Sequence, residues 1–515
     1  MSHIFAALFR HPAGSVFCEF FKAGQRRTVT FGELRASAGL AAARLRDAGV
    51  IAGQVVPIVL EHRVELYGSF VGCTLIGAVP SFLPPLTAKQ DPALFRQGMS
   101  ALLARIDPPC VIGSDATLPS LAGRRVLNVD APEQARAAIG FADAPATGIA
   151  FLQHSSGTTG LKKGVQLTHD AVLAQVARYT AAIALDEHDI IASWLPLYHD
   201  MGLITGFLLP AILGVPVVSL DALEWTARPT LLLDMMERFR ATLAWLPNFA
   251  FHHIARMAPA GRDWDLASVR LLVNCSEPCR TAAFDVFAAR FAASSIGPER
   301  LAACYAMAEC VFAATQTAPG QAPRRHGEYV SSGRAIAGIE IDIRDIDRAT
   351  GIGAIHLRGP FLFDGYFGQP ELSAAKLRDG WLTTGDLGFL AEGELVVVGR
   401  ADDMLNINGR KILAHEVEDA LAMLPGLLPG RILAYAELDP HSGAMRLNIA
   451  AERAPLATDD EADDAHANAH AIRRTVFSVC AVRPHAVTLH GPGFLVKSTS
   501  GKLARAASVA RLRGD

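Results

Sequence analysis

Lysine is scarce in this chain of 515 residues, and neither sign of charge is in excess. Lysine supplies only eight of the 48 basic residues, and the formal net charge is −3. Such a chain has no basic field to attract nucleic acid or an anionic membrane, so neither is an expected partner. Most of the lysines fall in three short motifs, which indicates a need for the compact ammonium group there. These are Lys162, Lys163, Lys411, Lys497 and Lys502.

Cysteine is also scarce, and long unbroken apolar runs are missing. The eight cysteines form no Cys-x-x-Cys motif, so we expect buried thiols in a reducing cytoplasm rather than disulfides or zinc. The N-terminal apolar run is too short for a signal peptide. Residues 202–220 are uncharged but contain Pro210 and Pro216. That favours a buried helix followed by a strand over a transmembrane segment.

Hydrophobic residues are abundant, at 50% of the chain, whereas 19% of residues are charged. This composition excludes a disordered chain. Short apolar runs alternate with stretches of helical spacing, a pattern typical of parallel sheets covered by helices. The pattern predicts strands at residues 55–60, 149–153, 190–195, 215–220 and 271–275, and helices at 170–184 and 229–240.

Residues 338–398 differ, because short predicted strands and close turns predominate there. Beyond a boundary near residues 399–403, the pattern predicts a helix at 412–423 and strands at 432–438 and 447–452. We therefore expect an α/β fold in two domains. Residues 1–400 would form a large multi-lobed domain, with two parallel-sheet lobes and a β-rich lobe, and residues 401–515 a small mobile α+β domain. His466 and His470 have the spacing of two ligands on a helix, but no further ligand is evident, so we expect no metal there.

Residues 154–164, HSSGTTGLKKG, directly follow a predicted strand. Serine, threonine, glycine and lysine crowd into this turn, which offers hydroxyl, ammonium and backbone N–H donors to a polyphosphate. The string lacks the Gly-Lys-Ser/Thr of the common nucleotide loop. Its composition alone leaves a phosphate-binding loop and a plain polar loop equally open.

The string resembles the phosphate-binding signature of the adenylate-forming superfamily, usually SSGTTGxPKG, with Lys162 in place of proline. Other strings similar to that family's motifs follow in its order. They are LPLYHDMG (195–202), NCSEP (274–278), YAMAE (305–309), TGD (384–386), GRADDMLNINGRK (399–411) and STSGKLAR (498–505). The likeness spans about residues 30–510 and is strongest to fatty acyl-AMP ligases.

The resemblance implies an enzyme that uses ATP and Mg²⁺ to activate a carboxylic acid as acyl-AMP, releasing pyrophosphate. Because that reaction brings two anions together, cations and donors must neutralise the phosphates. Glu309 would hold Mg²⁺, a hard cation that prefers carboxylate and phosphate oxygens. The residues expected to bind ATP are Ser155, Ser156, Gly157, Thr158, Thr159, Gly160, Lys163, Ser276, Glu277, Pro278, Tyr305, Asp386, Arg400 and Lys411.

The resemblance also assigns catalytic roles to Lys502, Glu309 and His199. The ammonium of Lys502 would bridge the carboxylate and the α-phosphate, and it could leave when its loop moves. His199 would line the entry for the carboxylate. Asp402 would be the hinge at which the C-terminal domain turns between two half-reactions. Local sequence alone would allow Lys502 to be a solvated lysine and Asp402 an ordinary turn residue.

The expected substrate is an uncharged aliphatic or fatty acid. Residues 198–202, YHDMG, match the acyl-AMP ligases rather than the amino-acid-activating relatives, and the candidate pocket is largely apolar. Its residues would be Trp245, Phe249, Asn274, Met307 and Val311.

The acyl group would then pass to a phosphopantetheine thiol, and the motifs favour an acyl carrier protein as the partner that bears it. Fatty acyl-AMP ligases carry an extra segment before a Ser-x-Gly string that hinders transfer to coenzyme A. Here Thr317, Ala318 and Pro319 are joined to Ser331 by residues 320–330 alone, so we expect this extra segment to be absent. A complete acyl-CoA synthetase that uses coenzyme A therefore remains an alternative.

Two further classes are weighed against this ligase. A luciferase-like oxygenase would also form an acyl-adenylate, but no residue here indicates oxygen chemistry. A non-catalytic adenylate-binding module is disfavoured by the joint presence of Glu309, Asp386 and Lys502.

Overall fold

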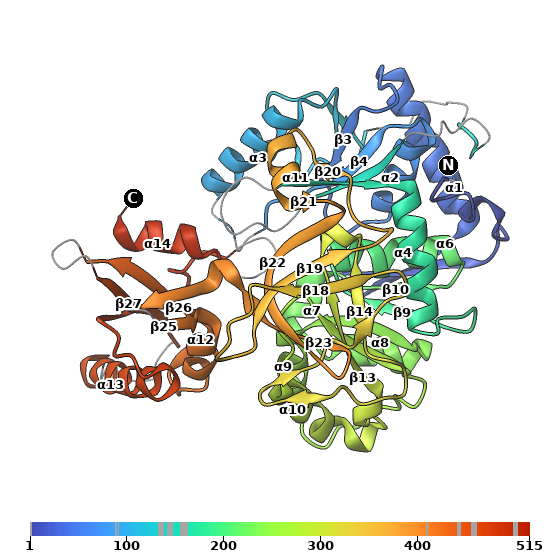
Figure 1. The fold of residues 1–515 in the computed structure, drawn as a ribbon. Helices are drawn as coiled ribbons and strands as arrows, with labels where there is room; N and C mark the ends of the chain where they lie inside the picture. Colours follow the sequence, from blue (N-terminus) through green and yellow to red (C-terminus); the bar gives the residue numbers. More distant parts are fainter. Residues whose placement is uncertain are drawn as a thin grey trace. The chain divides into compact units, whose positions relative to one another are not determined.

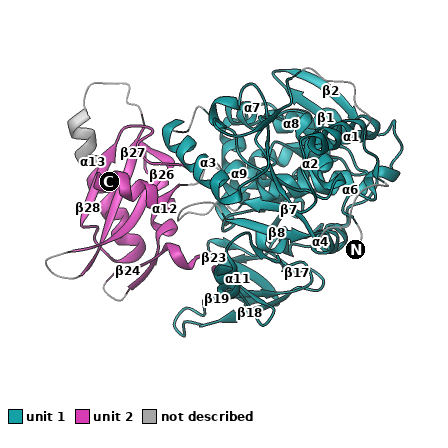
Figure 2. Ribbon diagram, turned by 90° about the horizontal axis from the view of Figure 1, so that it is seen from above, with its two compact units in different colours: residues 1–155, 161–384, 388–398 teal, residues 156–160, 385–387, 399–515 magenta. Residues whose placement is uncertain are grey.

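A computed structural model gives the fold of the protein (Figure 1). It describes residues 3–87, 90, 92–131, 138–141, 148–154, 163–407, 410–439, 444–454, 461–497 and 503–514. The chain divides into two compact units (Figure 2). Unit 1 comprises residues 1–155, 161–384 and 388–398, and unit 2 comprises residues 156–160, 385–387 and 399–515.

A four-stranded parallel sheet, in the order β4-β3-β5-β6, lies in the N-terminal part of unit 1. Helix α1 (Phe31–Asp47) begins at a capping box, in which Thr30 and Glu33 satisfy each other's backbone N–H groups. It packs closely on α2 (Glu65–Leu75), because a Cβ at Gly72 would lie 2.7 Å from the carbonyl oxygen of Ala38. The strands are β3 (Val55–Ile58), β4 (Val79–Phe82), β5 (Val111–Gly113) and β6 (Val126–Asn128), and α3 spans Pro92–Ile106.

A nine-stranded sheet follows, in the order β17-β14-β13-β12-β11-β9-β10-β1-β2. Its six central strands are parallel, and their side chains alternate between two buried faces, as Leu243 and Trp245 do against Ala244 and Leu246. These strands are β1 (Val16–Lys22), β9 (Ile191–Ser193), β10 (Val217–Ser219), β11 (Leu243–Pro247), β12 (Leu271–Cys275) and β13 (Leu301–Ala306). The remaining strands, which pair antiparallel, are β2 (Gln25–Thr30), β14 (Ala313–Gln316) and β17 (Arg334–Ala335). Helices α4 (His169–Ala182), α8 (Leu231–Phe239), α9 (Asn248–Met257) and α10 (Thr281–Phe291) bury apolar residues against the sheet.

The segment predicted as a buried helix before a strand is a helix in three parts. They are α5 (Asp200–Leu203), a π-helical turn (Ile204–Leu208) and α6 (Leu209–Leu213). The helix ends at Gly214, which has φ 81°, and β10 follows. None of the helices in the described ranges is long and apolar enough to cross a membrane.

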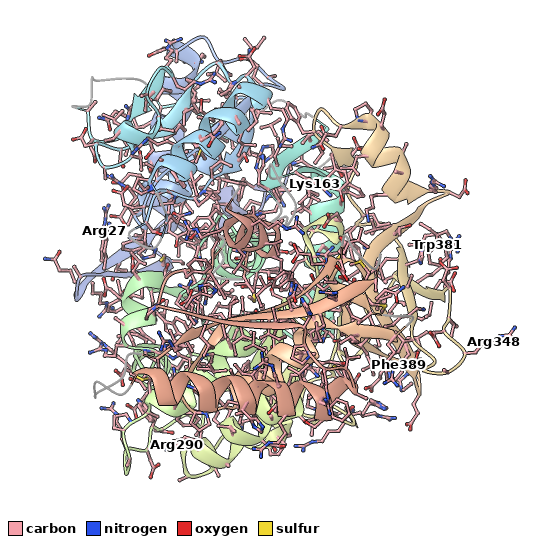
Figure 3. All side chains as sticks on the ribbon, turned by 90° about the vertical axis from the view of Figure 1, so that its left-hand side faces the viewer. Arg27, Lys163, Arg290, Arg348, Trp381 and Phe389 are labelled. Carbon is pink, nitrogen blue, oxygen red and sulfur yellow. The ribbon has the colours of Figure 1, made fainter. Side chains whose placement is uncertain are left out.

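Unit 1 also contains two smaller sheets of three and five strands. Strands β7 (Ile149–His154), β8 (Gly164–Thr168) and β20 (Gly365–Tyr366) form one of them. The other contains β18 (Glu340–Arg344), β19 (Gly353–Arg358), β21 (Leu377–Arg378), β22 (Trp381–Ala391) and β23 (Glu394–Arg400), whose end runs into unit 2. The guanidinium groups of Arg344 and Arg358 lie 5.0 and 4.7 Å from the ring centroid of Trp381, which is labelled in Figure 3.

Unit 2 is built on a sheet of β26 (Leu427–Leu438), β27 (Met445–Arg453) and β28 (Ala486–His490). Helices α12 (Ala414–Ala422) and α13 (Glu461–Cys480) cover one face, and α14 (Arg505–Arg513) covers the other (Figure 1). The prediction of a helix from residue 412 was wrong at its start. Ile412 and Leu413 belong to β25 (Arg410–Leu413), because they pair with β24 (Met404–Ile407).

The predicted fold class is confirmed, with parallel-sheet lobes, a β-rich lobe and a small α+β unit. All eight cysteines are free thiols, and seven of them are buried. Burial raises the pKa of the Cys110 thiol to about 11, and it also raises the pKa of Cys73, Cys279 and Cys304. These thiols are therefore protonated and protected near neutral pH.

Candidate active site

The predicted phosphate loop is bounded by two paired strands. β7 and β8 are antiparallel, and His154 pairs with Gly164, so residues 155–163 start and end side by side. Nδ1 of His154 lies 2.8 Å from Oγ of Ser81, which holds the start of the loop to β4. Ser155, Ser156, Gly157, Thr158, Thr159 and Gly160 lie outside the described residues, and their phosphate contacts stay predictions.

Lys163, the last residue of this loop, lies beside Tyr366. Its Nζ is 5.5 Å from the centroid of the Tyr366 ring. Tyr366 pairs with Val165 across β20 and β8, so the strand that leaves the loop also places this phenol. Gly365 has φ 136°, and a Cβ there would lie 3.0 Å from Oγ of Ser373, so glycine fits this position best.

Glu309 contacts the same phenol from a turn that follows another strand. It lies in a 3-10 turn (Ala308–Cys310) just after β13, and its Oε1 accepts a 2.8 Å hydrogen bond from the Tyr366 hydroxyl. Its backbone oxygen accepts a second bond, also 2.8 Å, from the N–H of Phe363. The structure therefore gathers a carboxylate, a phenol and an ammonium where the loop ends. This is the chemistry that a magnesium–polyphosphate complex requires.

The turn that carries Glu309 is closed by a strained residue. Val311 has φ 63° and ψ −54°, and the N–H of Phe312 donates to the carbonyl of Cys310 over 2.7 Å. This is a γ-turn of the rarer, strained kind, at a β-branched residue. Such strain costs about 1–3 kcal/mol and persists only where surrounding structure fixes it. Here the N–H of Met307 donates to the carbonyl of Phe312 over 2.8 Å, which locks the turn around Glu309.

The residues predicted to bind adenine lie on neighbouring parallel strands. Asn274 of β12 pairs with Ala303 of β13, so the chain leaves β12 toward Ser276 at the edge of the sheet to which β13 carries Tyr305. Ser276 has φ 76°, which turns the chain out of β12 directly before Glu277 and Pro278. The backbone N–H of Tyr305 donates to Oγ1 of Thr315 over 3.2 Å, and its side chain is 7% exposed. The structure thus brings the two predicted walls to one sheet edge.

His199 occupies the N-cap position of α5, where its side chain makes no capping hydrogen bond. Its Nδ1 lies 3.5 Å from Oδ1 of Asp200, and that oxygen also accepts from the N–H of Met201 over 2.8 Å. Nε2 of Gln153, on β7, donates to the carbonyl of Tyr198 over 3.0 Å. This bond ties the His199 turn to the strand that leads into the phosphate loop. The π-helical turn that follows is a rare feature found often at functional sites.

The five residues predicted to line an acyl pocket do not share one face of the sheet. Trp245 and Val311 belong to the apolar cluster that also contains Tyr305, and the half-buried Met307 packs against it. Asn274 points to the other face, because its Nδ2 donates to Oδ1 of Asn248 on α9 over 2.9 Å. Phe249, also on α9, is 45% exposed.

The indole of Trp245 is part of a buried chain of hydrogen bonds. Its Nε1 donates to the hydroxyl of Tyr179 over 2.6 Å, and that hydroxyl donates to Oε1 of Gln316 over 3.1 Å. Both rings are fully buried, and burial raises the pKa of Tyr179. Indole and phenol therefore belong to the buried core on this face of the sheet, in the apolar cluster that also contains Tyr305.

The other predicted nucleotide ligands belong to unit 2. Oδ1 of Asp386 lies 3.6 Å from Nε of Arg400, so the carboxylate and guanidinium predicted to hold the ribose are neighbours. Lys411 lies opposite Asn406 in the β24–β25 hairpin. Asp402 is exposed in a 3-10 turn (Ala401–Asp403). Lys502 lies outside the described residues.

Tyr366 was missed by the sequence analysis. It lies 57 residues from Glu309 in the chain, and it reaches that side chain only through the pairing of β20 with β8. The one sequence signal is a glycine directly before an aromatic residue in a turn-rich stretch, which is weak on its own.

Of the two histidines considered as a metal pair, only one side chain is described. The side chain of His466 lies outside the described residues, and His470 is exposed. Within the described ranges, no group of three or more His, Cys, Asp or Glu side chains could hold a metal ion.

Comparison with known proteins agrees with this arrangement. Residues 6–367 match the profile of the AMP-binding enzyme family, so the chain belongs to that family. The long-chain-fatty-acid–AMP ligase FadD26 of Mycobacterium marinum is 27% identical, across 96% of this chain and 92% of its own length. A structure from work on fatty acyl-adenylate ligases of E. coli and L. pneumophila superimposes with a TM-score of 0.85 at 25% identity, covering 100% of this chain and 98% of that one.

The fold recurs at greater sequence distance. The structure of McyG A-PCP complexed with phenylalanyl-adenylate has a TM-score of 0.86 at 21% identity, and covers 99% of this chain and 95% of that one. The chain is therefore an AMP-binding enzyme by family and by fold.

Proposed function

We propose that the protein uses ATP to activate an aliphatic carboxylic acid as acyl-AMP and then transfers the acyl group to a phosphopantetheine thiol. In the first step a carboxylate oxygen attacks the α-phosphorus, and the bond to the leaving pyrophosphate breaks. In the second step the thiol sulfur attacks the acyl carbon, its proton passes to solvent, and AMP leaves. The names of FadD26 and of the fatty acyl-adenylate ligase structure support this reaction.

The observation that carries the proposal is the meeting of Glu309, Tyr366 and Lys163 where the phosphate loop ends. Mg²⁺ commonly binds through one or two carboxylates together with substrate phosphates, rather than in an all-protein cage. A single carboxylate beside a phosphate-binding loop matches this mode of Mg²⁺ binding, so Glu309 would hold the ion. The bound ion would neutralise charge on the phosphates. Tyr366 fixes the Glu309 carboxylate, and Lys163 adds a second positive charge.

An apolar acid is favoured over an amino acid. The apolar cluster that contains Tyr305 also contains the aromatic side chains of Trp245, Tyr179 and Phe312 and the thiols of Cys275 and Cys304. An α-ammonium group would lose its hydration among such side chains. Free thiols and an ATP substrate also support a reaction in the cytoplasm as part of this proposal.

The acceptor we favour is an acyl carrier protein, because the sequence motifs resemble those of fatty acyl-AMP ligases and FadD26 is named as a fatty-acid–AMP ligase. One observation supports coenzyme A as the second candidate. The stretch between Thr317 and Gly333 is short and holds only the two-residue strands β15 (Arg325–His326) and β16 (Tyr329–Val330). No insertion is therefore present there to hinder a free thiol.

The experiment is a two-stage assay on the full chain. Pyrophosphate exchange is measured with a panel of fatty, aromatic and amino acids, and exchange that depends on an added fatty acid supports the adenylation step. Acyl-AMP is then offered to coenzyme A and to a phosphopantetheinylated carrier protein in separate reactions. Exchange with amino acids alone, or with no acid at all, would contradict the proposed substrate class.

A further inference from the structure

The side chain of Asn248 lies between the two ends of one turn. Asn248 is the first residue of α9 and directly follows Pro247, the last residue of β11. Pro247 pairs with Cys275 at the end of β12, so Asn248 enters its helix beside the point where the chain leaves β12. The wall turn, as we call residues 275–279, begins at that point. It carries residues 276–278, the predicted wall of the adenine site.

One oxygen of the Asn248 side chain accepts hydrogen bonds from both ends of the wall turn. Nδ2 of Asn274, the residue before the turn, donates to Oδ1 of Asn248 over 2.9 Å. The backbone N–H of Arg280, the residue after the turn, donates to the same oxygen over a longer distance of 3.4 Å. An amide oxygen has two lone pairs, so it can accept both bonds. Asn248 therefore joins the start and the end of the wall turn to α9.

Both residues that donate to Asn248 are buried. The exposed fraction is 0% for Asn274 and 9% for Arg280. Among the described residues, Oδ1 of Asn274 has no hydrogen-bond partner, so the bond from Nδ2 to Asn248 is the one that orients this amide. A buried donor that loses its partner has no water to replace it, which makes the loss costly. Removal of the Asn248 oxygen should therefore shift the wall turn.

The backbone of the wall turn depends on such support. Ser276 has φ 76°, in the left-handed region that residues with a side chain rarely adopt. Such a conformation persists only where the surrounding structure fixes it. The thiol of Cys279 donates to the carbonyl of Asn274 over 3.5 Å, and the carbonyl of Cys279 accepts from the N–H of Val330 over 2.9 Å. Asn248 adds to these contacts the connection between the turn and α9.

We propose that Asn248 is a positioning residue for the adenine of ATP, because it holds the wall turn where residues 276–278 can cover the base. This inference rests on the proposed function. The phosphates would be held by other elements, at Lys163 and Glu309, so a shift of the wall turn should weaken adenine binding and spare pyrophosphate binding. Adenine takes no part in bond breaking and is bound equally before and in the transition state. Loss of the Asn248 oxygen should therefore raise the KM for ATP and leave kcat unchanged.

The test compares two variants of Asn248 and a matched control with the parent by pyrophosphate exchange. Asn248→Ala removes the shared acceptor, whereas Asn248→Asp keeps an oxygen at the same place. The control is Asn448→Ala in unit 2, because Oδ1 of the buried Asn448 also accepts from a backbone N–H, that of Ala486, over 3.2 Å. The loss of one hydrogen bond corresponds to about a tenfold change in a binding constant. We expect Asn248→Ala to raise the KM for ATP about tenfold with kcat little changed, and Asn248→Asp to stay near the parent.

A second readout needs no turnover. Titration calorimetry with ATP and, separately, with pyrophosphate should show Asn248→Ala weakened for ATP only, and Asn448→Ala unchanged for both. If Asn248→Ala does not fold, Asn248→Ser, whose hydroxyl does not reach as far, takes its place in the same comparison.

Two results would overturn the positioning role: equal weakening of both ligands, or parental ATP affinity in a folded Asn248→Ala protein. A parent that binds ATP but activates no acid would contradict the proposed function instead, and the calorimetry would still decide the role of Asn248. A parent that binds no ATP would overturn both.

Discussion

The hydroxyl of Tyr366 donates to Oε1 of Glu309 over 2.8 Å, while Nζ of Lys163 lies 5.5 Å from the same ring. A hydrogen bond to a charged group contributes about 1.5–3 kcal/mol, so this phenol fixes the carboxylate that would hold Mg²⁺. Tyr366→Phe should raise the Mg²⁺ concentration needed for half-maximal pyrophosphate exchange and lower the rate about tenfold.

Tyr179→Phe is the matched control for that variant, because it removes the hydroxyl of a buried tyrosine that lies in a different network. It should lower the midpoint of unfolding without changing the Mg²⁺ requirement. If both variants shifted the requirement equally, Tyr366 would have only a structural role.

Lys502→Ala should reduce acyl-AMP formation while leaving ATP binding almost intact. One oriented electrostatic contact made in the transition state is worth about 10²–10³ in rate. Single-turnover formation of acyl-AMP measures the effect, and Lys497→Ala serves as the control with a smaller change. Parental rates in Lys502→Ala would remove this lysine from the mechanism.

Glu309→Gln and Asp386→Ala should behave differently under magnesium titration. Loss of the Glu309 charge should weaken Mg²⁺ binding, so activity should partly recover at high Mg²⁺. Loss of Asp386, whose carboxylate lies 3.6 Å from Arg400, should raise the apparent KM for ATP at every Mg²⁺ concentration. Matching titration curves would contradict the separate roles.

Asp402→Pro should separate the two half-reactions. Proline fixes φ near −65° and restricts the residue before it, so the turn should be held in one state. If that state is the adenylating one, acyl-AMP should still form while transfer to a thiol collapses. Asp402→Ala, which keeps the backbone free, is the control. Equal retention of both steps in a folded Asp402→Pro protein would exclude the hinge.

Acid should loosen the N-terminal segment through His169. Nδ1 of His169 accepts from the N–H of Ile4 over 3.2 Å, and burial lowers its pKa to about 4. The unfolded chain takes up this proton near pH 6.5, before the folded chain does, so stability should fall as pH falls from about 6.5 to 4. Urea midpoints at pH 7.5 and 5 should differ less in His169→Asn than in the parent. His188→Gln, at an exposed position, should leave the pH effect unchanged.

Local patterns in the sequence predicted the buried strands well. The strand expected at residues 271–275 is β12 (Leu271–Cys275). A strand that is buried on both faces is an unbroken apolar run, so it can be recognised in the sequence without knowledge of the neighbouring strands. The helix expected from residue 412 starts at Ala414, since pairing with β24 overrides the helical spacing of the first residues.

The site was predictable only where a motif carries its own chemistry. Glu309 and Lys163 were identified from their strings, whereas Tyr366 comes to them by strand pairing over 57 residues. Side chains alternate between the two faces along a strand, and this alternation puts Trp245 and Asn274 on opposite faces. The predicted pocket residues were chosen by their apolar character, without regard to the face on which each would lie. The loop residues 155–160 and Lys502 stay predictions.

The burial of the cysteines has a practical consequence for measuring domain motion. Seven of the eight thiols are buried, and only Cys480 is partly exposed. Burial also raises the pKa of the Cys480 thiol, which slows its reaction with maleimides. A Cys480→Ser background should therefore accept fluorescent dyes almost exclusively at cysteines that are introduced on purpose. A donor at the exposed Arg348 in unit 1 and an acceptor at the exposed Met423 in unit 2 would then test, by single-molecule energy transfer, whether a rotation occurs at Asp402, without removal of the native thiols from the core.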